Sequence, residues 1–293
     1  MATSTYAGNT LPPRDAMRGF YHRLRGGDEV AYISTLIAAI AILAIVGLIV
    51  TELWLNSRPT IHAFGWHFLT SAAWDPNSDR YGALPFIYGT CVTSFLALLV
   101  AVPLGVASAI FLAEMAPPKI SNVLTFLIEL LAAVPSVIYG LIGIFVLLPI
   151  IGRWLVPVLE KSLGSLPIFS GDFYGVSFLS AGLVLSIMVV PFIVSVSREV
   201  LLAVPVEQRE AALALGATKW ETTWQIVIPN ASTGIIGSVF LALARALGET
   251  MAVTMVIGNT PKIAASLFSP GYSIAAVIAM NLPKPAATYT YRL

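Results

Sequence analysis

The stretch "PVEQREAALALGATKWETTWQIVIPN", residues 205–230, decides how this chain is organised, because it is a charged insertion between two long apolar runs. Pro205 suits the first position of a helix, and residues 206–215 are rich in good helix formers. Gly216 suits the C-terminal cap of that helix, since glycine adopts left-handed backbone angles without a steric cost. The first half of the stretch is therefore predicted to be a short helix that ends at Gly216.

A second helix is predicted directly after this glycine. Thr218 and Glu221 have the spacing of a capping box, in which each side chain bonds the backbone N–H of the other residue. Pro229 marks where the second helix stops or kinks. Such a helix pair has two interpretations: it lies on the membrane surface as an interfacial pair, or it is a docking knob for a soluble partner.

The composition indicates a membrane protein. Of the 293 residues, 57% are hydrophobic and 11% are charged, whereas a soluble domain carries about 25% charged residues. The net charge of +1 gives no reason to expect a nucleic-acid partner. The single cysteine, Cys91, excludes an intrachain disulfide, and the three histidines lack the neighbours of a metal site. Neither a metal nor a cofactor is expected.

Five apolar segments are long enough to cross a bilayer, which takes about 20 residues of helix. They predict an all-α integral membrane protein, a polytopic helical bundle. The first segment follows a polar stretch, residues 1–29, that is too long for the start of a signal peptide, so it is expected to be an uncleaved span. The predicted spans run from Val30 to Leu53, Thr90 to Ala113, Val123 to Ile150, Phe178 to Ala203 and Ser232 to Ile257.

The lysines and arginines that flank these spans favour a cytoplasmic N-terminus, by the positive-inside rule. With that orientation eight of them lie inside and five outside. Residues 1–29 and 205–230 are then cytoplasmic. Tryptophans and tyrosines within residues 54–88 fit an aromatic belt on the outer side.

Prolines interrupt three of the predicted spans, at Pro103, Pro135 and Pro191. Proline removes a helix hydrogen bond and kinks the helix. In a membrane such a break is tolerated where neighbouring groups satisfy the backbone again. These positions are compatible with ordinary membrane-helix prolines and equally with hinges around a pathway.

Ionisable side chains also interrupt the spans. In "FLALARALGETMAV", residues 240–253, Arg245 and Glu249 stand four residues apart, and a charge at the centre of a span costs about 2.5–3.5 kcal/mol. The spacing places both on one helix face, where they are expected to pair. They form either a structural ion pair or a polar patch that faces a hydrated pathway. Glu129 lies near the start of the third span, where a structural or solvated role is at least as well supported as a functional one.

A longer pattern runs through the cytoplasmic stretch. Glu210-Ala211-Ala212, three residues, Gly216, nine residues and then Ile226-Val227-Ile228-Pro229 resembles the EAA loop of ABC importer permeases, EAA-x3-G-x9-I-x-L-P. Ile228 in place of leucine is the one departure. The resemblance implies coupling helices that dock in a groove of the ATP-hydrolysing subunit. The coupling residues that it implies are Glu210, Ala211, Ala212, Gly216, Ile226 and Pro229.

Further stretches narrow the family. They are similar to permeases of the phosphate-specific transport (Pst) system over about residues 68–279, and "RALGETMAV" is closer to the PstC type than to the sister PstA type. The stretches are "GALPFIYGTCVTSFLALLVAVPLGV", "LLAAVPSVIYGL", "VVPFIVSVSREVL" and "RALGETMAVTMVIGN".

This resemblance implies a permease subunit of an ATP-driven inorganic phosphate importer, of the type I ABC permease class, in a bacterial inner membrane. The implied partners are a PstA-like sister permease, a PstB-like ATPase dimer and an extracytoplasmic PstS-like phosphate-binding protein. Transport is expected by alternating access. Arg245 and Glu249 are then expected to face the translocation pathway at the interface with the sister permease.

The chain is not expected to be an enzyme, because it lacks the Gly-x4-Gly-Lys-Ser/Thr phosphate cradle and the common hydrolase motifs. The hydrolysis of ATP is therefore assigned to another chain. A permease for another oxyanion, such as molybdate or sulfate, is the alternative function. An ion-coupled secondary transporter is a further alternative, but it has no use for an EAA loop.

The C-terminal region departs from the family, which continues into a sixth span. The apolar run at 273–280 has eight residues and reaches only about 12 Å, against a hydrocarbon core of about 30 Å. The sixth span is therefore expected to be missing or truncated. The predicted organisation is an N-terminal segment (1–29), a first span with the start of an outer segment (30–67), a permease domain (68–282) and a divergent tail (283–293).

Overall fold

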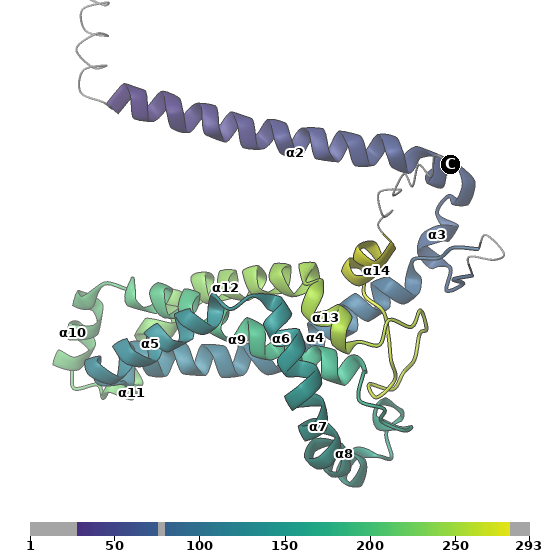
Figure 1. Cartoon of the computed structure of the whole chain (residues 1–293). Coiled ribbons are helices and arrows are strands. Elements are labelled where there is room, and N and C mark those ends of the chain that lie inside the picture. Colours follow the sequence, from purple (N-terminus) through teal and green to yellow (C-terminus); the bar gives the residue numbers. More distant parts are fainter. Residues whose placement is uncertain (1–27, 76–79, 282–293) are drawn as a thin grey trace, which may run out of the picture. The chain divides into compact units, whose positions relative to one another are not determined.

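The computed structural model describes residues 28–75 and 80–281, and helices dominate these residues (Figure 1). The chain divides into two compact units, Met1–Trp66 and His67–Leu293. Within the described residues, five helical stretches are long and apolar enough to cross a membrane. This confirms the predicted all-α membrane fold.

The described part of the first unit contains one long helix, α2 (Asp28–Phe64). Its side chains are exposed along the apolar stretch, as Leu43 at 72% and Leu48 at 70% illustrate. The helix continues past the predicted end at Leu53. At 1.5 Å per residue its 37 residues extend about 55 Å, which exceeds the thickness of a bilayer core.

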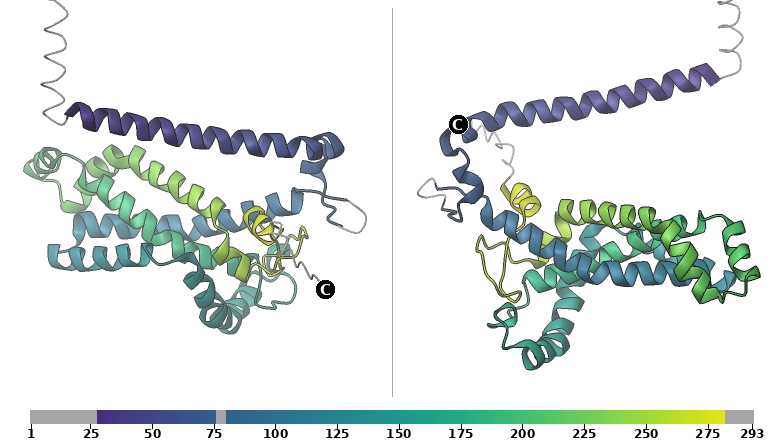
Figure 2. Two further views of the ribbon diagram at one scale, coloured as in Figure 1. Left: turned by 45° about the horizontal axis from the view of Figure 1, so that its top comes forward. Right: turned by 180° about the vertical axis from the view of Figure 1, so that it is seen from behind.

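The second unit is built around α9 (Phe178–Leu202), and α4 (Leu84–Ile110) and α12 (Ile228–Gly248) pack against it (Figure 2). Of the candidate spans, α9 has the largest buried share, 67% of its most apolar window. Small residues permit this close packing: Ser197 of α9 and Ser238 of α12 are both buried, and their hydroxyl oxygens lie 2.7 Å apart.

The third predicted span, Val123 to Ile150, is wrong as a single helix. The structure places α5 at Pro118–Ala132 and begins α6 (Ser136–Ile142) after a break at residues 133–135. Pro135 explains the break, because proline disfavours helical angles at the residue before it. The membrane-length stretch is instead Ser136–Leu163, formed by α6, η3 (Gly143–Leu147), α7 (Leu148–Ile150), η4 (Ile151–Leu155) and α8 (Val156–Leu163).

The other two prolines lie inside unbroken helices, Pro103 within α4 and Pro191 within α9. Helix α4 runs on through a π-helical turn, η2 (Phe111–Met115). The three prolines therefore have different consequences, and only Pro135 separates two helices.

The fifth predicted span also differs from the structure at both ends. It begins earlier, at α11 (Lys219–Thr222), and runs through the π-helical turn η6 (Thr223–Val227) into α12. Pro229 is at the start of α12, so the helix neither stops nor separates there. At the other end α12 stops at Gly248, and a separate short helix, α13 (Met251–Val256), follows.

The remaining elements lie at the two ends of the second unit (Figure 1). Helix α10 (Val206–Ala214) and α11 form one end, whereas α14 (Ile274–Asn281) and the loop 257–273 lie at the other. The short helices α3 (His67–Thr70) and η5 (Pro167–Phe169) complete the described structure. The predicted tail at 283–293 and the cytoplasmic segment up to residue 27 lie outside the described residues.

The loop 257–273 is fastened to the helices by backbone hydrogen bonds. The N–H of Phe178 donates to the carbonyl of Ser269 at 3.1 Å, and the N–H of Leu179 donates to the carbonyl of Leu267 at 2.9 Å. On the α4 side, Gly89 lies so close to Tyr272 that an added Cβ would stand 2.1 Å from the Tyr272 carbonyl oxygen.

We predict that Gly89→Ala destabilises the second unit by about 1–3 kcal/mol, because the methyl group forces a backbone shift in a packed region. The measurement is the thermal unfolding of the purified protein in detergent. Gly237→Ala is the matched control, since a Cβ at Gly237 meets no atom within 4 Å. Equal melting temperatures for the two variants would contradict the close packing of α4 on this loop.

Candidate functional site

The stretch 205–230 forms the predicted helix–turn–helix. Helix α10 ends in a Schellman motif: Gly216 has φ +90°, its N–H donates to the Leu213 carbonyl at 3.0 Å, and the Ala217 N–H donates to the Ala212 carbonyl at 3.1 Å. Pro205 is the N-cap residue rather than the first helical residue, because α10 begins at Val206. The left-handed glycine thus sets the angle between the two helices.

The second helix begins with the predicted capping box. The Glu221 N–H donates to the Thr218 hydroxyl oxygen at 3.2 Å, and the Thr218 N–H donates to the Glu221 carboxylate at 2.8 Å. The start of α11 is therefore fixed locally by two reciprocal hydrogen bonds.

The residues of the EAA pattern are mostly accessible. Glu210, Ala211, Gly216 and Pro229 are exposed, whereas Ala212 and Ile226 are half-buried. A groove of about 560 Å³ opens between the two helices, and the residues that line it include Ala211, Ala212, Gln225, Ile226 and Asn230. The pattern thus presents a small-residue surface at one end of the second unit.

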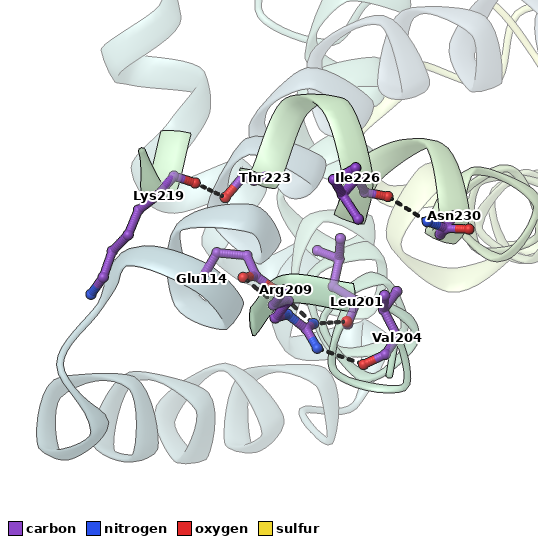
Figure 3. A network of polar contacts seen from close by, with 8 residues as sticks. All are labelled: Glu114, Leu201, Val204, Arg209, Lys219, Thr223, Ile226 and Asn230. Atoms are coloured by element: carbon purple, nitrogen blue, oxygen red, sulfur yellow. Dashed lines mark hydrogen bonds and ion pairs between the residues drawn. The ribbon is translucent and has the colours of Figure 1, made fainter. Parts of the chain in front are cut away.

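A network around Arg209 joins α10 to the rest of this unit (Figure 3). The Arg209 guanidinium donates to the Glu114 carboxylate at 2.9 and 3.4 Å. It also donates to the carbonyl oxygens of Leu201, at 2.7 Å, and of Val204. One side chain therefore connects three elements: α10, the end of α9 and the π-helical turn that follows α4.

The sequence reasoning did not select Arg209 or Glu114 as functional residues. The weak signal at Glu114 is its position, a lone carboxylate at the end of a long apolar run. Nothing in the pattern indicates its partner, which is 95 residues away in the chain.

The predicted pairing of Arg245 with Glu249 is wrong. The i, i+4 argument requires a continuous helix, but α12 ends at Gly248 and Glu249 has extended backbone angles (φ −71°, ψ 126°). The Glu249 carboxylate instead accepts a hydrogen bond from the Ala252 N–H, at 3.2 Å, at the start of α13. Glu249 thus caps a helix break rather than neutralising Arg245.

Arg245 remains without an anionic partner among the described residues. Its guanidinium carbon lies 5.7 Å from the centre of the Phe192 ring, which gives a cation–π contact with α9. The Nε atom is buried and has no hydrogen-bond partner. Tyr139 of α6 lies within electrostatic reach of this charge. Glu129, by contrast, is exposed on α5.

The comparisons with known proteins decide the family. The family model described as "Binding-protein-dependent transport system inner membrane component" matches residues 101–283, which include both the helix pair and Arg245. The chain belongs to this family of ABC transporter permeases. As a member, it is a membrane transport subunit and not an enzyme.

Two relatives of this permease are called "Phosphate transport system permease protein PstC". The one from Xylella fastidiosa (strain 9a5c) is 44% identical over 99% of the chain and 87% of its own length. The one from Haemophilus influenzae is 45% identical over 84% of the chain and 79% of its own length. A solved inward-facing MetNI methionine ABC transporter is similar at 19% identity with a TM-score of 0.40, over 59% of the chain and 70% of its own.

Membership of the family places the five apolar stretches in an inner membrane as a multi-pass subunit. It also means that the permease works with an ATPase and other subunits of an ABC system.

We predict that Gly216→Val keeps the permease in the membrane but loses its association with the ATPase subunit. A β-branched residue at a left-handed position costs about 1–2 kcal/mol, because its Cβ crowds the backbone. The measurement is co-purification of the ATPase with a tagged permease. Gly216→Asn is the matched control, since asparagine tolerates left-handed angles and should retain the association. Normal co-purification with valine would show that docking does not depend on this turn.

Proposed function

We propose that the chain is a permease subunit of an ATP-driven importer of inorganic phosphate. The observation that carries the proposal is the accessible EAA helix pair, in a chain that is 44% identical to a PstC phosphate permease over nearly its whole length. The helix pair supports coupling to an ATPase, and the relatives support phosphate as the substrate.

The proposed complex contains a PstA-like sister permease, a PstB-like ATPase dimer and an extracytoplasmic PstS-like binding protein. The helix pair α10–α11 docks in the ATPase on the cytoplasmic side through Glu210, Ala211, Ala212, Gly216, Ile226 and Pro229. The loop 257–273 is at the opposite end of the second unit and is assigned to the outer side (Figure 1). This assignment places the N-terminus in the cytoplasm.

Transport then follows alternating access. Closure of the ATPase dimer moves α10 and α11, and the helix breaks at 133–135 and 249–250 let short segments change their angle. Arg245 offers a passing phosphate a permanent charge and a fork of N–H donors. Glu249 borders the same pathway and holds the start of α13.

The test of substrate is uptake of labelled phosphate by the reconstituted complex, with molybdate and sulfate as competitors. Uptake that requires ATP and the binding protein, and that neither competitor inhibits, is the expected result. If molybdate or sulfate inhibits the uptake of labelled phosphate, the chain is instead a permease for that other oxyanion. Uptake that persists without ATP but depends on an ion gradient would indicate an ion-coupled secondary transporter.

For the orientation, we predict that a cysteine at Thr218 is protected from an impermeant thiol reagent in intact cells, whereas a cysteine at Lys262 is labelled. Both positions are exposed in the structure, so protection reports the membrane side rather than burial. The background lacks Cys91. Labelling of both positions after the cells are opened is the control, and the reverse pattern in intact cells would invert the topology.

For the pathway, we predict that Arg245→Gln lowers phosphate uptake by at least about tenfold, because charge-assisted hydrogen bonds contribute about 1.5–3 kcal/mol each. Arg245→Lys retains part of the uptake, since the charge survives without the fork. Glu249→Gln is milder, because glutamine still accepts the Ala252 N–H. The measurement is uptake in cells that depend on this importer.

The controls are the membrane level of each variant and its association with the ATPase, both of which should match the wild type. The decisive variant replaces Arg245 and Glu249 together with leucine. Normal phosphate import by that double variant would place the pathway elsewhere.

A further inference from the structure

The connection between α9 and α10 is a short elbow, residues 203–205. Helix α9 ends at Leu202 and α10 begins at Val206, so three residues separate the two helices. Helix α10 contains no fully buried residue. The elbow itself is anchored by Val204, which is buried in an apolar cluster with Leu201 and Val227. Beyond the elbow, the angle of α10 depends largely on polar contacts made by its own side chains.

Arg209 supplies these contacts to α9. Its donors bond the carbonyl oxygens of Leu201 and Val204, which lie at the end of α9 and in the elbow. The last carbonyls of a helix lack partners within that helix, and its C-terminus carries a partial negative charge. A guanidinium at this point therefore satisfies the hydrogen bonds and the electrostatics together, and it fixes the elbow angle (Figure 3).

Glu114 extends the same contact to a third element. It lies in η2, directly after α4, and accepts two hydrogen bonds from Arg209. The side chains of Arg209 and Glu114 are only 18% and 11% exposed. Partly buried, bidentate ion pairs are stronger than surface pairs, and removing one partner leaves a charge that is poorly solvated. The ion pair therefore holds α10 and η2 in a fixed relative position.

The two helices of the pair therefore connect to the membrane part in different ways. Helix α11 is continuous with η6 and α12, so its movement reaches a membrane span through the helix backbone. Helix α10 has no such continuity. It is joined to α11 by the turn 215–218, and it reaches α9 and α4 through the elbow and through Arg209.

We infer that Arg209 is a positioning residue that carries the movement of α10 to α9 and α4, with Glu114 as its anchor; the inference rests on the proposed function. Without the contacts of Arg209, the elbow between α9 and α10 bends when the ATPase dimer closes. ATP is then still hydrolysed, but the membrane spans do not follow, and hydrolysis is uncoupled from phosphate import.

The experiment measures phosphate imported per ATP hydrolysed by the complete complex in proteoliposomes, with the binding protein present. Arg209→Gln should lower this ratio by about 5- to 150-fold, which is the change in affinity that typical coupling free energies between two sites produce. Arg209→Lys should fall between the wild type and Arg209→Gln, because the ion pair survives without the carbonyl bonds. Arg153→Gln is the matched control, since it removes an exposed arginine of η4, and its ratio should equal that of the wild type.

A purely structural role of Arg209 would reduce the amount of active complex, which lowers import and hydrolysis together and leaves the ratio unchanged. That result overturns the inference, as does an unchanged ratio at normal activity. If Arg209→Gln does not assemble, Glu114→Gln decides in the same way, because it keeps the carbonyl bonds and removes only the anchoring charge. A lowered ratio for this variant supports the inference, and an unchanged ratio overturns it.

The failure of the proposed function gives a different result. It would show as an absence of ATP-dependent phosphate uptake by the wild-type complex. The ratio is therefore interpreted only after the wild type has been shown to import phosphate.

Discussion

The structure depends on one constraint, which is that a helix break within a membrane must satisfy its own backbone polar groups because lipid offers no hydrogen bonds. The described breaks meet it with side chains. Across the gap after α5, the Tyr139 hydroxyl donates to the Leu131 carbonyl at 2.6 Å. Across the gap after α12, Glu249 accepts the Ala252 N–H. The same kind of contact occurs outside the proposed membrane region, where Arg209 donates to two carbonyls at the end of α9 and in the elbow that follows. The breaks are therefore specific features of the fold, each closed by a dedicated polar group.

The second unit has a long central helix and a group of short helices packed against it. Helix α9 is the central helix, because α4 and α12 pack along it and Ser197 bonds across to α12. The short helices α6 and α13 belong to the group. They pack on each other so closely that a Cβ at Gly140 would stand 2.6 Å from the Met255 sulfur and 3.2 Å from the Ala252 Cα. Each begins after a break in the chain, and both belong to one buried apolar cluster with α9, so they are packed on the central helix. The pair lies next to the Arg245 segment of α12, because Tyr139 belongs to the same buried cluster as Ala242 and Ala246.

The features that local chemistry determines were predictable from the sequence, and those that depend on distant contacts were not. Gly216 and the Thr218–Glu221 box act within a few residues, so the helix pair was predicted correctly. Pro135 is recognisable as a point of interruption, but the sequence does not show that it separates two helices whereas Pro103 and Pro191 do not. The end of α12 at Gly248 is not predicted either, because apolar periodicity continues through it. That periodicity measures hydrophobicity and not the hydrogen-bond partner that makes a break tolerable. The contact of Arg209 with Glu114 lies beyond any local pattern, since the two residues meet only when α4 and α9 are packed together.

Arg209 and Arg245 differ in how their donors are used, and this difference separates a structural arginine from the proposed substrate site. Arg209 directs its donors at a carboxylate and two carbonyls, so it has little capacity left for a ligand. Arg245 makes a cation–π contact with the Phe192 ring, and its buried Nε has no hydrogen-bond partner. An ion pair with Glu249 would neutralise this charge and compete with any anion for its donors. The Glu249 carboxylate instead accepts the Ala252 N–H at the start of α13, so it does not pair with the guanidinium. The proposed pathway needs a positive site that an anion can enter and leave. Arg245, which lies next to a helix break and has no anionic partner among the described residues, is the candidate for that site.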